Sequence, residues 1–410
     1  MKIRLMKCAG VVAVLTMVVA ADWPQWLGPQ RNGSSPEKDL LTTWPKEGPK
    51  VLWKVPGGDG YSSIAVADGR AFTLVQRDKD ELVIALDAVT GKELWTRRSG
   101  PAYKNQYGNG PRSTPAIEGD FVYIQSVTGP LMCLETKTGN VVWQHDLLKE
   151  FAAKNLGWGL SASPLIEGDL VLALPGGKGA GVAAFNKKTG KIVWKTGDDK
   201  AAYASPMAVT VAGTRQIIFF TAAGLLSVAA KDGAELWRVP WITEFDCNIA
   251  TPLVIGDRLF VSSGEEVGCA LYKLASNSGP DLLWESKGKD GVMTNYWATA
   301  VVHDGHLYGL SGEFNKAIHL NCVDLKTGKL KWSQKKFGKA SVTLAAGHLF
   351  LVTKKGDVVL AKASPEKYEE KARMPLLGET RTAATIANGR LYLRDLQNIW
   401  CLDIKGKNEP

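Results

Sequence analysis

The segment Ala85-Leu-Asp-Ala-Val-Thr-Gly-Lys-Glu-Leu-Trp95 is one of a series of related segments in this chain. Close copies run from Cys133 to Trp143 and from Ala184 to Trp194, and a degenerate copy places Trp284 one residue further from its glycine. With one upstream tryptophan included, the series is marked by Trp53, Trp95, Trp143, Trp194, Trp237, Trp284 and Trp332. Successive members lie 42, 48, 51, 43, 47 and 48 residues apart. Such a period is typical of a repeat array.

A glycine-centred turn lies between successive tryptophans, as in Asp68-Gly69-Arg70 and Asn388-Gly389-Arg390. Eight such turns occur, each between short β-rich runs. Asp-Gly and Asn-Gly favour tight hairpins because both residues tolerate positive φ. The Thr-Gly pair of the long segment makes a second turn, in which the acid or amide four residues earlier accepts hydrogen bonds from turn amides. Each repeat is therefore predicted to be a small antiparallel meander.

The repeats predict an all-β fold, an eight-bladed β-propeller of four-stranded antiparallel blades. The last repeat, Thr382 to Lys407, has sequence for three strands, whereas Lys50 to Val55 supplies an outer strand with nothing before it. If these segments pair, the N- and C-terminal strands close the ring and remove its exposed edges. Blade seven is expected to be atypical, because Ser364 to Met374 carries charges and no tryptophan.

The seven repeated tryptophans are interpreted as structural residues that dock one blade on the next. Indole is a large, mostly apolar plate with one hydrogen-bond donor, which suits it to sealing one sheet against another. Recurrence at one place in successive repeats favours this packing role over a row of ligand platforms.

The N-terminus has the layout of a secretory signal peptide. Lys2, Arg4 and Lys7 precede an apolar run from Ala9 to Ala20, and small residues lie before Asp22. The run is too short to cross roughly 30 Å of hydrocarbon. We therefore expect cleavage at about residue 21, a periplasmic or secreted protein, and no membrane span in the mature chain. Cys8 lies before the apolar run, so a lipid anchor is not expected.

The expected organisation is a signal peptide (1–21), an N-terminal extension (22–49), one propeller domain (50–407) and a short tail (408–410). The sequence leaves open whether residues 34–49 are ordered. The chain has 50 Lys and Arg against 41 Asp and Glu, and removing the signal peptide lowers the net charge from +9 to +6. The basic residues are scattered among acids, so no nucleic-acid partner and no polybasic membrane patch are expected.

The long segment resembles the tryptophan-docking motif of the pyrroloquinoline-quinone-like (PQQ-like) propellers, and the resemblance covers Lys50 to Lys407. That superfamily includes the quinoprotein dehydrogenases and also BamB, the non-enzymatic propeller lipoprotein of the outer-membrane barrel assembly machinery. The stretch from Asp22 to Gly33 is similar to the leader of many exported bacterial proteins of this repeat type. The resemblance implies the propeller fold and leaves the activity open.

Loops that enter the innermost strands meet at one mouth of a propeller channel, where a ligand would be bound. The candidate ligand-binding residues in these loops are Tyr107, Asn109, Arg112, Trp158, Tyr203, Asp246, Asn248, Tyr296, Trp297 and Arg381. Either arginine could pair with a carboxylate or a quinone, and the tryptophans could stack on a planar ring. Asp246 is the candidate base or metal ligand. The favoured interpretation is that these polar groups satisfy one another and channel water.

Cysteine and histidine patterns indicate no cofactor or metal. The chain lacks the adjacent cysteines often found in quinoproteins of this fold, and it lacks haem and zinc motifs. Cys133, Cys322 and Cys401 occupy a position where other repeats carry alanine or serine, which predicts a small core niche. Cys247 and Cys269 belong to one repeat, and the sequence leaves open whether they form a disulfide.

The function ranked first is an exported, non-catalytic propeller that acts as a binding or scaffold module in the periplasm or cell envelope. An envelope or periplasmic protein is its expected partner, and no cofactor is expected. The first alternative is a PQQ- and calcium-dependent dehydrogenase that oxidises alcohols or aldoses and holds the quinone with Arg112, Trp158, Asp246 and Asn248. The second is a carbohydrate-binding propeller with a glycan or other small molecule in the channel.

Overall fold

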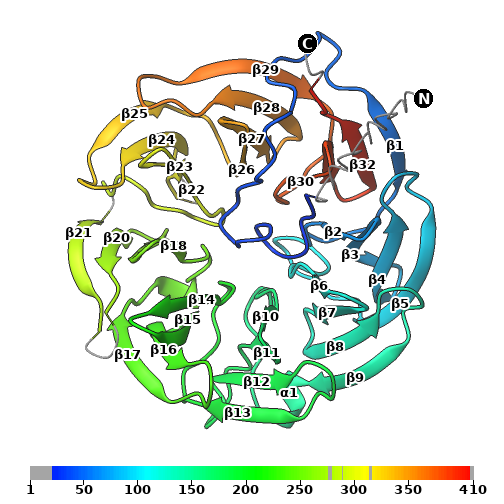
Figure 1. The fold of residues 1–410 in the computed structure, drawn as a ribbon, viewed down its shortest axis with the longest axis vertical. Coiled ribbons are helices and arrows are strands. Elements are labelled where there is room, and N and C mark those ends of the chain that lie inside the picture. Colours follow the sequence, from blue (N-terminus) through cyan, green and yellow to red (C-terminus); the bar gives the residue numbers. More distant parts are fainter. Residues whose placement is uncertain (1–20, 276–278, 289, 314–315, 407–410) are drawn as a thin grey trace, which may run out of the picture.

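The computed structural model describes residues 21–275, 279–288, 290–313 and 316–406. These residues form eight four-stranded antiparallel sheets arranged as blades around a central axis (Figure 1). The predicted eight-bladed propeller is therefore confirmed. The expected signal peptide (apart from Ala21) and the tail lie outside the described residues.

Each of the first seven blades uses four consecutive strands, from the innermost to the outermost. Blades one and two are β2 (Ala65–Ala67), β3 (Arg70–Arg77), β4 (Asp80–Asp87), β5 (Glu93–Pro101), β6 (Ala116–Glu118), β7 (Phe121–Gln125), β8 (Pro130–Glu135) and β9 (Val141–Asp146). Blades three and four are β10 (Leu165–Glu167), β11 (Leu170–Ala173), β12 (Val182–Asn186), β13 (Ile192–Thr196), β14 (Met207–Val211), β15 (Thr214–Thr221), β16 (Gly224–Ala229) and β17 (Glu235–Pro240).

Blades five and six are β18 (Leu253–Ile255), β19 (Arg258–Ser263), β20 (Gly268–Lys273), β21 (Asp281–Lys287), β22 (Val301–His303), β23 (His306–Ser311), β24 (His319–Asp324) and β25 (Leu330–Gln334). Blade seven is β26 (Ala340–Ala345), β27 (His348–Thr353), β28 (Asp357–Lys362) and β29 (Glu369–Pro375). The loops hold one α-helical turn, α1 (Leu147–Glu150), and one 3-10 turn, η1 (Glu244–Asp246).

Blade eight closes the ring with both ends of the chain. Its inner strands are β30 (Thr385–Ala387), β31 (Arg390–Arg394) and β32 (Asn398–Asp403), and its outermost strand is β1 (Val51–Pro56) from the N-terminal side. β1 pairs antiparallel with β32. The predicted closure by terminal strands is therefore confirmed.

The third and outermost strands of every blade share one irregularity. In blade one, Ala85 pairs with Trp95 while Leu86 pairs with Glu93, so Leu94 is an extra residue. The register shifts at the equivalent place in the other seven blades. A β-bulge increases local twist and re-aims the neighbouring side chain. We infer that the bulge turns the tryptophan toward the next blade.

The tryptophans dock on the turn between the third and outermost strands of the following blade. Trp143 is 8% exposed, and its indole Nε1 donates to the carbonyl of Lys187 at 2.9 Å. The ring lies against Gly190, whose φ is +71° and where an added Cβ would come within 2.7 Å of the indole. Equivalent indole-to-carbonyl hydrogen bonds extend from Trp53, Trp95, Trp194, Trp284 and Trp332.

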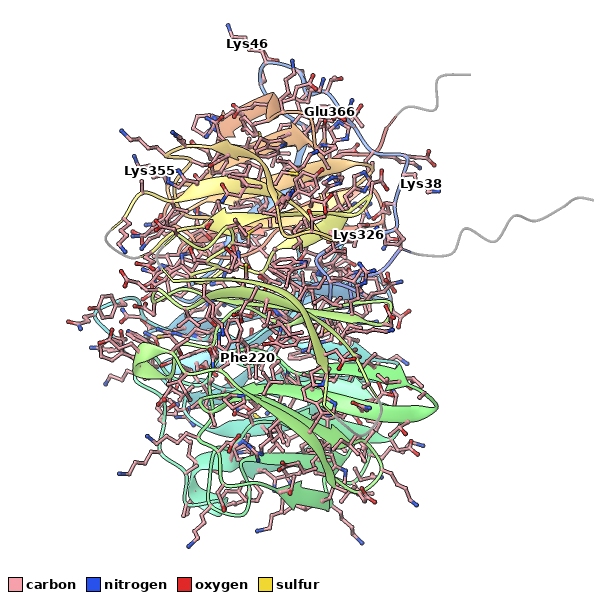
Figure 2. All side chains as sticks on the ribbon, turned by 90° about the vertical axis from the view of Figure 1, so that its left-hand side faces the viewer. Lys38, Lys46, Phe220, Lys326, Lys355 and Glu366 are labelled. Carbon is pink, nitrogen blue, oxygen red and sulfur yellow. The ribbon has the colours of Figure 1, made fainter. Side chains whose placement is uncertain are left out.

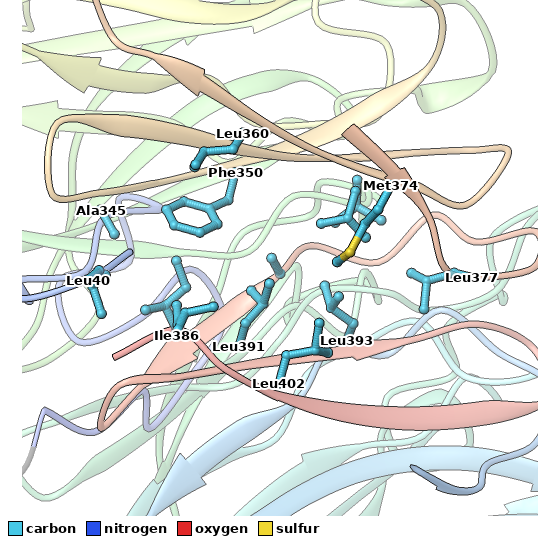
Figure 3. Packing of buried hydrophobic residues seen from close by; sticks show 14 residues of the cluster. Leu40, Ala345, Phe350, Leu360, Met374, Leu377, Ile386, Leu391, Leu393 and Leu402 are labelled. Atoms are coloured by element: carbon cyan, nitrogen blue, oxygen red, sulfur yellow. The ribbon is translucent and has the colours of Figure 1, made fainter. Parts of the chain in front are cut away.

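Two junctions depart from this pattern. Trp237 donates instead to the side-chain Oε1 of Gln216 in its own blade. The following blade, which contains Trp284, carries the degenerate copy of the motif. Between blades seven and eight, where the repeat offers no tryptophan, a buried cluster contains Met374 of β29 and Leu40 of the extension (Figure 3). Trp44 of the extension packs on Phe350 in the same cluster, with 6.2 Å between ring centroids.

The N-terminal extension, called the strap here, covers residues 22–49 and crosses the centre of the ring (dark blue in Figure 1). The Trp23 amide donates to the carbonyl of Val66 in β2 at 2.9 Å. Further along, Ser35 donates to the carbonyl of Leu344 in β26, and Leu41 donates to that of Ile404 after β32. Residues 34–49 therefore make defined contacts with the last two blades.

All five cysteines in the described residues are buried, free thiols. Cys247 and Cys269, whose pairing the sequence left open, are thus not bridged. Cys133, Cys322 and Cys401 lie in the cores between blades, as a small niche requires.

We predict that Gly190→Ala destabilises the protein far more than Gly168→Ala. Both glycines have positive φ, so both substitutions carry similar backbone strain. An added methyl at Gly190 would overlap the Trp143 ring, whereas nothing lies within 4 Å of one at Gly168. We expect an additional loss of about 1–3 kcal/mol in the free energy of unfolding for Gly190→Ala, measured by urea denaturation. Equal losses would show that the indole does not press on this turn.

The buried thiols predict a loss of stability at alkaline pH. Burial raises the pKa of Cys133 and Cys401 to about 12 and that of Cys322 to about 11. Above about pH 9 the unfolded chain releases thiol protons that the folded chain retains, so stability falls as pH rises.

A triple Cys133→Ala/Cys322→Ala/Cys401→Ala variant should lose less stability than the wild type between about pH 7 and pH 10. The expected difference is on the order of 2 kcal/mol per thiol at about pH 10. Urea denaturation across this range measures it. Parallel pH profiles for the two proteins would contradict the assignment.

Candidate functional site

The loops of the disc divide between two faces. Because strands alternate in direction, loops entering each innermost strand share a face with loops between second and third strands, and we call it the mouth face. The glycine-centred turns lie on the opposite, turn face. Seen from the side, Lys355 of a mouth-face loop and Lys326 of a turn lie on opposite sides of the disc (Figure 2). All ten candidate site residues belong to mouth-face loops.

The strap passes through the channel beneath the mouth. The indole Nε1 of Trp26 donates to the hydroxyl of Thr251, just before β18, at 2.9 Å. Trp26 also shares the lining of one hollow with Trp297 and Arg381. The floor of the mouth is therefore built by the chain's own N-terminal segment.

Arg31 anchors the strap on the other side of the channel. It is 2% exposed, and its guanidinium donates to the carbonyls of Ser163 and Pro164 and to Oε1 of Gln25. Burial lowers the pKa of Arg31 to about 9. Carbonyl dipoles thus replace water around this cation, and the contact fixes the strap against the entry of β10.

Two small hollows lie at the mouth. A hollow of about 250 Å³ lies among Trp26, Trp297 and Arg381. A second hollow of about 200 Å³ lies beside it, among Tyr296, Trp297 and Lys339. Pockets that enclose ligands generally measure about 300–1,000 Å³. Neither hollow has the size of a formed small-molecule site.

Three predicted aromatic residues meet on blades two to four. Trp158 lies edge-on to Tyr107, with 5.9 Å between ring centroids, and packs at 5.7 Å against Tyr203. The Trp158 amide donates to the hydroxyl of Tyr203. Burial raises the pKa of this phenol, so the hydroxyl remains protonated at physiological pH.

The two predicted arginines gather around Tyr61. The Arg112 guanidinium lies 5.9 Å from the Tyr61 ring and 5.1 Å from the Tyr103 ring, and it donates to the carbonyls of Gly108 and Gly110. The guanidinium of Arg381 lies 4.9 Å from the Tyr61 ring. Burial lowers the pKa of Arg112. These cations are held by ring faces and carbonyl oxygens rather than aimed into an open pocket.

Two predicted amides act within the loops instead of facing a ligand. Asn248 is fully buried; its Nδ2 donates to the carbonyls of Thr221 and Trp241, and its Oδ1 accepts from Ser263. Asn109 lies within hydrogen-bond distance of Asp59, and its Oδ1 accepts from the Asn105 amide.

The remaining predicted residues lie on blades five and six. Asp246 ends η1 with a φ of 58° and is half-buried. Tyr296 lies 4.8 Å beneath the Lys339 ammonium, and burial, followed by the effect of Glu265, raises the pKa of Tyr296 to about 12. Trp297 lines both hollows.

Four residues that the sequence did not single out complete the mouth: Trp26, Tyr103, Phe245 and Lys339. Phe245 is 65% exposed and meets Trp158 edge-on at 6.4 Å. A phenylalanine in a sequence suggests a core position, although the place of this loop before an innermost strand and its neighbours Glu244 and Asp246 both indicate the surface. Trp26 lacks the repeat period that marks the docking tryptophans.

The mouth face carries opposite charges on its two sides. On blades five and six, Glu265 lies near Glu244 and Glu313, and burial together with these carboxylates raises its pKa. On blades seven and eight, burial together with Lys354 and Arg381 lowers the pKa of Lys339. We call these sides the acidic half and the basic half.

The residues present do not fit the quinone site expected for a dehydrogenase. Asn248 has its amide fully engaged, the guanidinium of Arg112 is held by loop carbonyls, and Trp26 of the strap is bonded to Thr251 in the channel below. Within the described ranges, three or more His, Cys, Asp or Glu side chains nowhere gather as a metal-binding group. Among the same residues, no helix has the length and hydropathy needed to span a membrane.

Comparison with known proteins shows that most of the repeats match the model of one family. The model of the family described as outer membrane protein assembly factor BamB matches residues 34–107 and 79–334. BamB of Yersinia pestis is 23% identical over 318 residues, which are 74% of this chain and 76% of that protein. BamB from Moraxella catarrhalis superposes with a TM-score of 0.65 at 15% identity, covering 87% of this chain and 100% of that chain.

A dehydrogenase match is much shorter. Quinohemoprotein alcohol dehydrogenase ADH IIB of Pseudomonas putida is 30% identical over 134 residues, which are 30% of this chain and 19% of that enzyme. In sequence, the likeness to this enzyme is therefore local, whereas the likeness to the assembly factors spans most of the repeats.

We predict that Trp23→Ala loosens the strap. Trp23 is 2% exposed, and its ring packs against Gly28. Truncating a buried tryptophan costs about 3–5 kcal/mol of stability. We expect a lower melting temperature and faster tryptic cleavage at the exposed Lys38, with exposed Gln30→Ala as the control. Wild-type cleavage rates in Trp23→Ala would contradict this role for Trp23.

Proposed function

Because the chain belongs to the family of the outer membrane protein assembly factor BamB, we propose that it is a non-catalytic scaffold that helps to assemble proteins of the outer membrane. Its working surface is the mouth face. The proposal includes export of the chain to the periplasm, removal of residues 1–21, and a mature protein made of the strap (22–49) and one propeller (50–407).

One observation carries the proposal: the mouth displays apolar side chains above a channel that the strap crosses (Figure 1). Ile242 is 67% exposed, Phe245 is 65% exposed and Tyr107 is 40% exposed, all on mouth-face loops. Large exposed apolar groups on rigid supports are typical of protein-binding surfaces. Because the strap occupies part of the channel and these side chains are exposed, binding on the surface is the activity that this geometry supports.

Deleting the gene should lower the amount of folded β-barrel protein in the outer membrane of the source organism. Heat-modifiable migration of outer membrane proteins on gels measures the folded fraction. Wild-type protein and a Val89→Ser variant should restore it, because Val89 is 54% exposed on the turn face. Ile242→Ser should restore it less, because it removes an apolar contact from the mouth face. An unchanged folded fraction in the deletion strain would refute the proposed function.

The quinone alternative has its own test. We expect no saturable quenching of tryptophan fluorescence when pyrroloquinoline quinone is added to the mature protein with calcium, because Trp26 and Arg31 of the strap bond to residues that line the channel. The same titration on a quinoprotein dehydrogenase is the positive control. Calcium-dependent binding followed by dye reduction with an alcohol would make this protein an enzyme and overturn the proposal.

A further inference from the structure

The mouth face carries an aromatic surface built from two loops. Trp158 comes from the loop into β10, and Phe245 from the loop into β18. Their rings meet edge-on at 6.4 Å, and Tyr107 adjoins Trp158 on the far side. We call Trp158 and Phe245 the aromatic platform. It joins two blades and offers a large apolar area on a fixed support.

The backbone presents Phe245 at a conformational cost. Phe245 and Asp246 both have a φ of 58°, a region that bulky residues rarely adopt. The neighbouring chain is firmly held, because Asn248 bonds across to Thr221, Trp241 and Ser263. The fold thus holds a strained loop in the conformation that exposes this ring.

Carboxylates lie beside the platform. Glu244 and Asp246 flank Phe245 in the sequence, and Glu265 lies near Glu244 and Glu313. Lys316 pairs with Glu313 at 2.9 Å and with Glu266 at 2.6 Å. Glu244, Asp246 and Glu265 therefore leave a negative field beside the rings.

The aromatic rings of the mouth face differ in whether a cation of this chain covers them. Arg112 and Arg381 lie over Tyr61, and Lys339 lies over Tyr296. Among the described residues, no cation of this chain lies over Trp158 or Phe245. The rings of Trp158 and Phe245 therefore remain available to a cation from another molecule, and the nearby carboxylates would favour its approach.

We infer that the aromatic platform and its carboxylates dock a cationic, partly apolar segment of a partner polypeptide. Lysine or arginine side chains of the segment lie on Trp158 and Phe245, with their charged groups toward Glu244, Asp246 and Glu265. This inference rests on the proposed scaffold function and specifies the chemistry of its partner.

Fluorescence anisotropy with two labelled peptides tests the inference. One probe is a peptide of about ten residues that alternates lysine and leucine, and its twin carries glutamate in place of lysine. The mature protein should bind the lysine peptide more tightly than its twin, and the binding should weaken between about 50 and 200 mM salt. Equal binding of both peptides would overturn the inference.

Variants locate the binding on the surface. Phe245→Asn keeps a residue that tolerates positive φ, and Glu244→Gln/Asp246→Asn removes two charges. Each should weaken binding of the lysine peptide about tenfold or more. Asp169→Asn/Asp304→Asn makes the same charge change at exposed turn-face positions and should leave binding unchanged. Melting temperatures of all variants check folding. Undiminished binding by the folded mouth variants would overturn the inference.

Complementation separates this inference from the proposed function. If the deletion strain loses folded β-barrel protein and the mouth variants restore it fully, the scaffold function stands and the docking inference fails. If the deletion has no effect, the scaffold function fails whatever the peptides show.

Discussion

Each blade of this propeller depends on a contact made by its neighbour. A bulge beside the docking tryptophan turns its indole toward the next blade. The glycine in a turn of that blade leaves room for the ring. The single indole N–H then donates to a turn carbonyl, so neither of these two groups is left without a hydrogen bond where two sheets meet. Six of the eight junctions use this contact, and together with the packing at the other two they hold the sheets in register around the axis.

Most of the fold could be predicted, because the sequence repeat indicates where each blade begins and ends. The Trp period, the paired turns and the incomplete last repeat determine the number of blades and the way the ring closes. The path of the strap could not be predicted, because Trp23, Leu27 and Leu40 show no periodicity and their partners are scattered over the whole chain. The same limit applies at the seventh junction, where Leu40 and Trp44 fill a site that the repeat leaves without tryptophan.

The sequence indicated which loops form the mouth. It did not indicate which of their side chains are buried and which are exposed. The position of each loop before an innermost strand follows from the repeat alone. Asn248 and Phe245 belong to one loop, yet the amide is buried and the ring is exposed. Local backbone conformation and hydrogen bonding determine which side chain is buried, and no sequence pattern predicts either of them. The first-ranked function, a binding or scaffold propeller of the envelope, agrees with the long matches to assembly factors.

The strap also sets the order in which the molecule can be completed. Ser35 bonds to Leu344, and Asp22 accepts from Asn388, so residues made first find their partners among those made last. Contacts between such distant residues form slowly, because a long stretch of chain must be ordered before they are gained. An N-terminus that needs blades seven and eight cannot settle while the chain is still emerging. The finished disc can therefore form only after the entire polypeptide has reached the compartment in which it folds.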